Sequence, residues 1–356
     1  QKKLSMYIKQ LLKYNRNRDG WMIFLKLFFT LLITVLLVFI FSIPHAVMIF
    51  HQLLVDAGAD FSNLESVINV FPTIESQLAT MDVASQMSIL ESNLNLFLML
   101  LSFCGMLLAV ILCNKFINKN SFLSLTTSRS KIDFKRVFFS FSVWGSFSFI
   151  MIIIGYFMFP ENYEINFNLK PFLILALIVV VLLPIQTSAE EYLFRGYMMQ
   201  NLGLITRNRW FPLLFSSVAF GLLHGANPEI EKFGSIVFVF YIGSGLFAGI
   251  MTLMDDGMEL ALGWHAANNM VAALLVTADW TALQTHSILK DVSNPESMPL
   301  TDVLIPVLFF FPLVLGIFSK KYGWTNWEDK LFGKIEFKDI ELSKSSSLKE
   351  SNIQDL

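Results

Sequence analysis

Three short stretches of an otherwise apolar sequence carry side chains that could together hydrolyse an amide bond. In the first, Glu190 and Glu191 are adjacent, and Arg195 follows Glu191 at the i,i+4 spacing that places two side chains on one helix face. Glu191 and Arg195 can therefore form a buried ion pair, whereas Glu190 is turned about 100° away and lacks that partner. This makes Glu190 the candidate general base.

The second and third stretches each contribute an imidazole. His265 and Asn269 are spaced i,i+4 and present an imidazole and an amide to one spot. Phe220 and His224 have the same spacing, so Phe220 is expected to wall the pocket. A carboxylate and an imidazole can activate one water, while a second imidazole and an amide donate to the oxyanion of a tetrahedral intermediate. No local arrangement activates Ser188 as a nucleophile, so we interpret it as a capping or packing residue.

Each of these groups also has a simpler interpretation. A single Glu–Arg pair or an Asn within an apolar helix is commonly a contact between helices. Ionisable side chains inside apolar segments are nevertheless costly, and their joint occurrence here favours a functional site. Two His and one Glu are also a known zinc ligand set. Because each His stands on a different segment, rather than both at i,i+4 on one helix, we expect no metal or other cofactor, with zinc as the alternative.

The composition indicates a membrane protein. The chain is 54% hydrophobic and 15% charged, against about 45–50% and about 25% in soluble domains. Apolar runs long enough to span a bilayer recur along it, and no Lys/Arg-rich stretch points to nucleic acid. The predicted spans are Trp21–Ile43, Leu96–Phe116, Val137–Phe159, Pro171–Gln200, Phe211–Gly225, Ser235–Met254, Met258–Thr277 and Val303–Lys320.

Charge placement gives the topology. The loop over residues 44–95 holds six acidic residues and no Lys or Arg. With Lys26 and Arg195 inside spans and Lys170, Lys232 and Lys290 on the outer side, 21 of the 26 basic residues remain on the other side. The positive-inside rule then places both termini in the cytoplasm. The predicted fold is an all-α polytopic membrane bundle of about eight transmembrane helices.

The chain divides into five parts by this pattern. They are an amphipathic basic segment (1–20), three spans with an outer loop at 44–95 (21–159), the part that carries the polar motifs (160–280), an outer loop with the last span (281–320) and a polar cytoplasmic tail (321–356). Apolar positions at helical spacing within residues 4–12 predict a helix on the inner leaflet. The tail from Lys338 onward is expected to be disordered.

The three motifs resemble those of the CAAX-protease and bacteriocin-processing family, the intramembrane glutamic proteases. They occur in the same order: Glu190-Glu191-x-x-x-Arg195, Phe220-x-x-x-His224 and His265-x-x-x-Asn269. The resemblance covers about residues 171–280. It implies that the first glutamate and first histidine activate water and that the second histidine and the asparagine form the oxyanion site. It also implies that the second glutamate and the arginine order the site.

The resemblance implies an intramembrane endopeptidase that acts on a peptide or membrane-anchored protein in the lipid bilayer. The Phe-, Lys- and Asn-rich composition indicates a bacterial cytoplasmic membrane, where we expect peptide maturation, bacteriocin immunity or cell-envelope regulation rather than prenyl-protein processing. The alternative is a non-proteolytic scaffold of the same fold, which would hold an extracytoplasmic partner through loop 44–95. A transporter is disfavoured, because its charges would occur in repeat-related halves.

Overall fold

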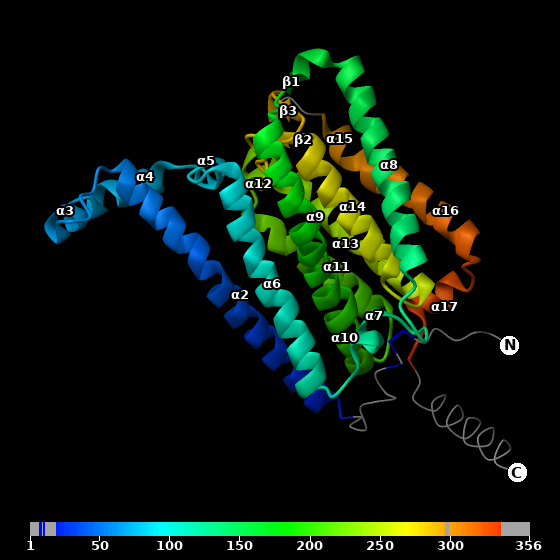
Figure 1. The fold of residues 1–356 in the computed structure, drawn as a ribbon. Helices are drawn as coiled ribbons and strands as arrows, with labels where there is room; N and C mark the ends of the chain where they lie inside the picture. Colours follow the sequence, from blue (N-terminus) through cyan, green and yellow to red (C-terminus); the bar gives the residue numbers. More distant parts are fainter. Residues whose placement is uncertain (1–6, 9, 11–18, 296–298, 336–356) are drawn as a thin grey trace, which may run out of the picture.

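The structure is a computed structural model that describes residues 7, 8, 10, 19–295 and 299–335 (Figure 1). It is a bundle of long helices, and six of the described helices are long and apolar enough to cross a membrane. They are Gly20–Asp56 (α2), Ser92–Phe116 (α6), Phe134–Met158 (α8), Leu169–Thr206, Pro228–Asp255 and Leu300–Tyr322. The predicted class, an all-α multi-pass membrane bundle, is confirmed.

Three of these six helices are built from consecutive segments. Leu169–Thr206 consists of α9 (Leu169–Glu191), the π-helix η2 (Tyr192–Met198) and α10 (Met199–Thr206). Pro228–Asp255 consists of α12 (Pro228–Phe233), the turn η4 (Gly234–Ile236) and α13 (Val237–Asp255). Leu300–Tyr322 consists of α15 (Leu300–Ile305), the π-helix η6 (Pro306–Phe310) and α16 (Phe311–Tyr322).

The two other predicted spans coincide with shorter helices. Phe211–Gly225 falls on α11 (Trp210–Leu223), which continues into the 3₁₀ turn η3 (His224–Ala226). Met258–Thr277 falls on α14 (Glu259–Leu275), which has 17 residues. Packing holds both helices in the bundle, since α11 lies against α13, and α14 lies against α8 and α9.

Acidic side chains set the starts of the first three long helices. Asp19 accepts a hydrogen bond from the Trp21 amide at the start of α2, and Glu91 accepts one from Leu94 at the start of α6. Asp133 caps α8 through the amide of Lys135. Such side chains satisfy amides that have no partner within the helix, which places the helix start at that residue.

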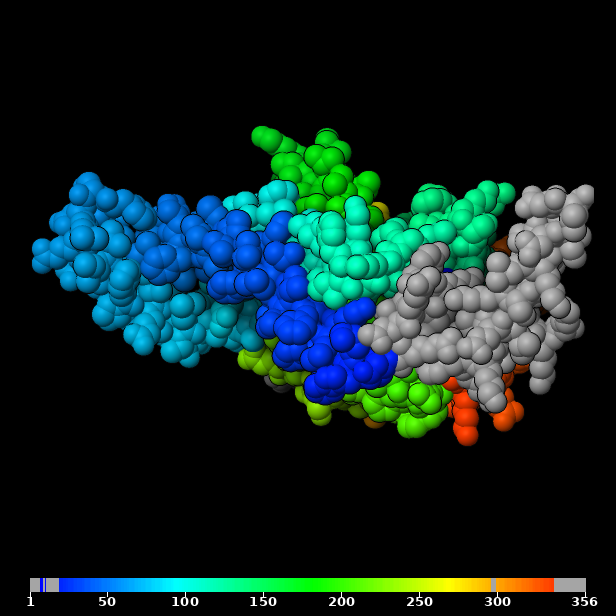
Figure 2. Space-filling view, turned by 90° about the horizontal axis from the view of Figure 1, so that it is seen from below, coloured from blue at the N-terminus to red at the C-terminus, as the bar shows by residue number. Residues whose placement is uncertain are grey.

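The outer loop is partly helical. Helix α2 continues past its predicted end at Ile43, through Pro44, to Asp56, because transmembrane helices tolerate an internal proline. Three short helices follow, α3 (Leu64–Asn69), α4 (Phe71–Thr80) and α5 (Val83–Met87). The end of α2 and the helices after it project to one side of the bundle (Figures 1 and 2).

A small sheet lies at the end of the bundle where α9 begins and α14 ends. Its order is β1 (Tyr163–Ile165), β3 (Leu289–Asp291) and β2 (Val276–Ala278). The first pair is antiparallel, with Tyr163 opposite Asp291, and the second pair is parallel, with Val276 opposite Leu289. The sheet joins the segment that precedes α9 to the segment that follows α14.

The opposite end of the bundle holds the start of α2, the short helix α7 (Phe122–Thr126) and α17 (Trp327–Phe332) (Figure 1). The predicted topology requires the start of the first spanning helix and the end of the last one to lie at the same end of the bundle. The assignment of that end to the cytoplasm stays a prediction. The predicted amphipathic helix within residues 4–12 falls mostly outside the described residues. The tail from Lys338 onward lies wholly outside them.

Helix α14 approaches α8 closely at Gly263, where a Cβ would overlap the carbonyl oxygen of Val137. Small residues of this kind allow membrane helices to pack at short range. We expect Gly263→Ala to lower the free energy of unfolding by about 1–3 kcal/mol, because α14 and α8 would have to separate. Unfolding of the purified protein in detergent micelles measures this difference.

The matched control is Gly316→Ala in α16, where a Cβ would meet no atom within 4 Å. That substitution is expected to leave stability unchanged or raise it by up to about 1 kcal/mol, because Ala is the better helix former. Equal losses in the two variants would contradict the close approach of α14 to α8.

Candidate active site

The site is assembled by one long helix and the three helices packed around it. The segment α9–η2 supplies Glu190, Glu191 and Arg195, and α14 supplies His265 and Asn269. The end of α11 supplies Phe220, and the turn η3 supplies His224. Helix α13 contributes backbone and an aromatic ring. The structure therefore brings the three predicted motifs into one region of the bundle.

Glu191 is the central acceptor of the site. Its Oε1 accepts a hydrogen bond from Arg195 Nη1 at 3.0 Å and from His265 Nδ1 at 2.8 Å. Arg195 also donates from Nη2 to the carbonyl of Gly245 at 3.1 Å. Glu191 and Arg195 are fully buried. The predicted contact between Glu191 and Arg195 is present. The hydrogen bond between Glu191 and His265 was not predicted, because it depends on how α9 crosses α14.

Arg195 lies within the π-helix η2, a wider turn than the α-helix on either side. Turns of this kind are rare and often occur at functional sites. The guanidinium carbon lies 4.4 Å from the ring centroid of Phe220, which makes a cation–π contact. A Cβ at Gly245 would lie 2.9 Å from the Cα and carbonyl oxygen of Ser217, so α13 closely approaches α11 beside the carbonyl that accepts from Arg195.

His265 lies between the two glutamates. Because an ionised Glu191 only accepts, the proton in their contact belongs to His265 Nδ1, which leaves Nε2 facing Glu190. His265 Nε2 lies 3.5 Å from Glu190 Oε2, and that oxygen is buried without a hydrogen-bond partner among the described residues. A proton between these two facing acceptors would join them in a hydrogen bond.

A polar chain that the sequence analysis missed holds the other oxygen of Glu190. Gln186 Nε2 donates to Glu190 Oε1 at 2.5 Å, and Gln186 Oε1 accepts from Asn269 Nδ2 at 3.0 Å. Gln186 stands four residues before Glu190 in an apolar span, which is the signal that could have found it. Asn268 donates to Asn269 Oδ1 and accepts from Trp144 Nε1, each at 3.1 Å. These bonds fix Asn269 and leave its second N–H available as a donor.

His224 is oriented by a different set of contacts. Its Nδ1 lies 2.8 Å from the carbonyl of Phe220, so Nδ1 donates and Nε2 is free to accept. Its ring stacks on Tyr241 of α13, with centroids 4.2 Å apart, and Asn227 donates to the Tyr241 hydroxyl at 3.1 Å. Neither of these two contacts was predicted, because no sequence spacing links α13 to the end of α11.

Phe220 lies between the two imidazoles. Its ring centroid is 4.8 Å from that of His224 and 5.9 Å from that of His265. No direct hydrogen bond joins His224 to Glu190 among the described residues. Phe220 therefore packs against both imidazoles, and its role as a pocket wall stays a prediction.

A metal would need a different donor arrangement. Within the described residues, no group of three or more His, Cys, Asp or Glu side chains could hold a metal ion. One nitrogen of His265 is used by Glu191, and one nitrogen of His224 is used by the Phe220 carbonyl. Zinc ligation by these histidines would therefore depend on their Nε2 atoms.

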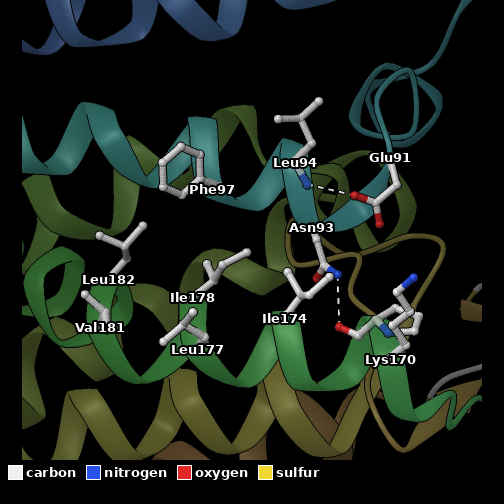
Figure 3. A pocket seen from close by; sticks show the side chains of 11 residues that line it. Glu91, Asn93, Leu94, Phe97, Lys170, Ile174, Leu177, Ile178, Val181 and Leu182 are labelled. Carbon is white, nitrogen blue, oxygen red and sulfur yellow. Dashed lines mark hydrogen bonds between the residues drawn. The ribbon is translucent and has the colours of Figure 1, made fainter.

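A groove of about 810 Å³ lies between α6 and α9 (Figure 3). Apolar side chains of α6 and α9 line most of it: Leu94, Phe97, Ile174, Leu177, Ile178, Val181 and Leu182. Its outer rim is polar, where Asn93 Nδ2 donates to the Pro171 carbonyl at 3.0 Å and Glu91 caps α6 (Figure 3). Leu182 at the inner end lies one helical turn before Gln186.

Comparisons with known proteins agree with the motifs. Residues 169–271 match a family model described as Type II CAAX prenyl endopeptidase Rce1-like. The chain is also similar to the uncharacterized protein YyaK of Bacillus subtilis (strain 168), with 34% identity over 169 residues, or 47% of this chain. The chain spans only 56% of the length of that relative, and no solved structure matches. The predicted resemblance to the CAAX-protease family is confirmed over the matched residues.

The ion pair between Glu191 and Arg195 leads to a prediction about the stability of the fold. Glu191→Gln keeps the side-chain shape but leaves the buried Arg195 guanidinium without its carboxylate, so it should lower the free energy of unfolding by about 3–5 kcal/mol. Glu190→Gln is the matched control, because no ion pair joins Glu190 to Arg195 among the described residues and Gln can still accept from Gln186. Its effect should stay within about 1 kcal/mol.

Unfolding of both variants in the same detergent measures the difference. Equal stabilities for the two adjacent substitutions would show that Glu191 does not compensate Arg195.

Proposed function

We propose, from the CAAX-endopeptidase match over residues 169–271, that this chain is an intramembrane endopeptidase that uses water as the nucleophile. The observation that carries the proposal is the buried Glu190 Oε2, which has no hydrogen-bond partner in the described part of the chain and faces His265 Nε2 at 3.5 Å. A carboxylate and an imidazole held this way can move a proton within the buried part of the bundle.

The first step is attack of water on the scissile carbonyl. Glu190 takes one proton as the water oxygen forms a bond to the carbonyl carbon, and His224 Nε2 accepts a hydrogen bond that orients the water. His265 is held in place by Glu191 and can hold the proton that Glu190 releases. The remaining N–H of Asn269 donates to the oxyanion. The structure thus favours His265 as a proton carrier, beside the oxyanion role that the sequence implied for it.

The second step breaks the C–N bond. The proton taken from water passes from the Glu190–His265 pair to the leaving nitrogen, which departs as an amine. The carbonyl carbon is released as a carboxylic acid, so atoms and charges balance. Glu191 and Arg195 do not touch the reacting atoms in this scheme. They orient His265 and keep its tautomer fixed.

The substrate is proposed to be a peptide or a membrane-anchored protein in a bacterial cytoplasmic membrane. The match alone leaves prenylated tails, peptide maturation, bacteriocin immunity and cell-envelope regulation as roles, and the composition favours the last three. The apolar groove between α6 and α9 supports a substrate with an apolar segment, because most of its lining on α9 is aliphatic and extends to Leu182.

The second candidate is a scaffold that holds an extracytoplasmic partner. The observation that favours it is the projection of the helices after α2 from the bundle, outside the matched residues (Figure 1). This region exposes apolar side chains: Phe61, Leu64, Ile68 and Phe71.

Glu190→Gln separates the two functions. In cells that lack the gene, wild type and the variant are expressed at matched levels, and new peptide ends are quantified by terminus-selective mass spectrometry. Loss of the general base should reduce the rate at which cut ends appear by about 100-fold or more. Glu164→Gln on the exposed strand β1 is the control and should behave as wild type.

Two results would reject the protease proposal. One is a Glu190→Gln variant that produces the same cut ends as wild type. The other is full rescue of the deletion phenotype without any wild-type-dependent cut end, which would favour the scaffold and direct the search to partners of α3–α5.

A further inference from the structure

Tyr7 lies far from the polar motifs in sequence but is buried beneath them. Its side chain has no exposed surface. Its hydroxyl lies 2.6 Å from the carbonyl oxygen of Leu125 in α7 and 3.1 Å from the carbonyl oxygen of Arg195 in η2. The hydroxyl has one hydrogen to share between these two carbonyl oxygens, and it links the backbone of a short helix to the backbone of the π-helix that carries the buried arginine.

The two other described residues near Tyr7 anchor the same segment. Ile8 is 2% exposed and packs against Gly203, where a Cβ would lie 2.8 Å from the Ile8 Cγ2 atom. Gln10 donates from Nε2 to the carbonyl of Ser124 at 2.6 Å, beside Gln200, which donates to the same oxygen at 3.0 Å. Tyr7 is the member of this group that contacts the site-bearing segment at Arg195.

We propose that Tyr7 is a positioning residue of the active site, which fixes η2 against α7 and thereby holds Arg195 in register. This inference rests on the proposed function, because the consequence passes from Arg195 to Glu191 and from Glu191 to His265. A π-helix is a rare departure from α-helical hydrogen bonding, and the Tyr7 hydroxyl adds a contact to the Arg195 carbonyl from outside that helix. Tyr7 itself touches no reacting atom.

Tyr7→Phe tests the hydroxyl and keeps the buried ring. The first measurement is hydrogen exchange by mass spectrometry on the purified protein in micelles, which reports local opening independently of activity. Exchange should increase in peptides that cover residues 192–198 and stay unchanged in α13. Gln10→Ala is the matched control, because it removes an anchor of the same segment that does not contact η2, and exchange at 192–198 should stay as in wild type.

The second measurement is turnover. The probe is an internally quenched peptide that carries the cut sequence found in the Glu190→Gln experiment. Tyr7→Phe should lower kcat by about three- to tenfold with KM unchanged, because one hydrogen bond at the arginine backbone is lost and no substrate contact changes. Gln10→Ala should keep the wild-type kcat.

Each outcome decides the inference. Faster exchange confined to 192–198 together with a lower kcat supports it. Wild-type exchange and turnover in Tyr7→Phe overturn it, as does an equal effect of Gln10→Ala or an increase in exchange over the whole bundle, which would mark Tyr7 as a general packing residue. If no cut sequence is found, the proposed function fails, while the exchange measurement still decides whether Tyr7 holds η2.

Discussion

The buried contact between Arg195 and Glu191 is the interaction on which the centre of this bundle depends. A guanidinium and a carboxylate removed from water are stabilised when their charges are paired within the protein. Here the arginine uses a carboxylate of α9, a carbonyl of α13 and the face of the Phe220 ring from α11, while the carboxylate also receives an imidazole from α14. Displacement of α11, α13 or α14 would leave this ion pair, which forms within one helix, without one of its other buried partners.

Close helix packing makes that matching geometrically attainable. Gly245 and Gly263 remove side-chain volume where α13 approaches α11 and where α14 approaches α8. Behind the polar residues, a cluster of aromatic rings from α8, α13, α14 and α16 fills the remaining space: Trp144, Phe247, Trp264 and Phe311. The polar network is thereby enclosed by large apolar groups, and Trp144 also belongs to it through its contact with Asn268.

Relations within one helix could be predicted from the sequence, and relations between helices could not. Spacing alone predicted the contact of Glu191 with Arg195 and the common face of Phe220 and His224, because both follow from helix geometry. The hydrogen bond between His265 and Glu191 depends on how α9 crosses α14, and the spacing of residues along the sequence does not specify that crossing. The same limit applies to the stacking of His224 on Tyr241. The π-helix was not predicted, because its extra residue per turn does not change the pattern of apolar residues in the sequence.

The small sheet has a mechanical consequence for the two helices that carry the chemistry. Strand β1 leads into α9, β2 continues directly from α14, and β3 pairs with both, so backbone hydrogen bonds fasten the start of one helix to the end of the other. Two helices that are joined at one end move apart most at their other ends. Changes in the distance between α9 and α14 are therefore smallest at the sheet and increase toward the end of the bundle that holds α7 and α17.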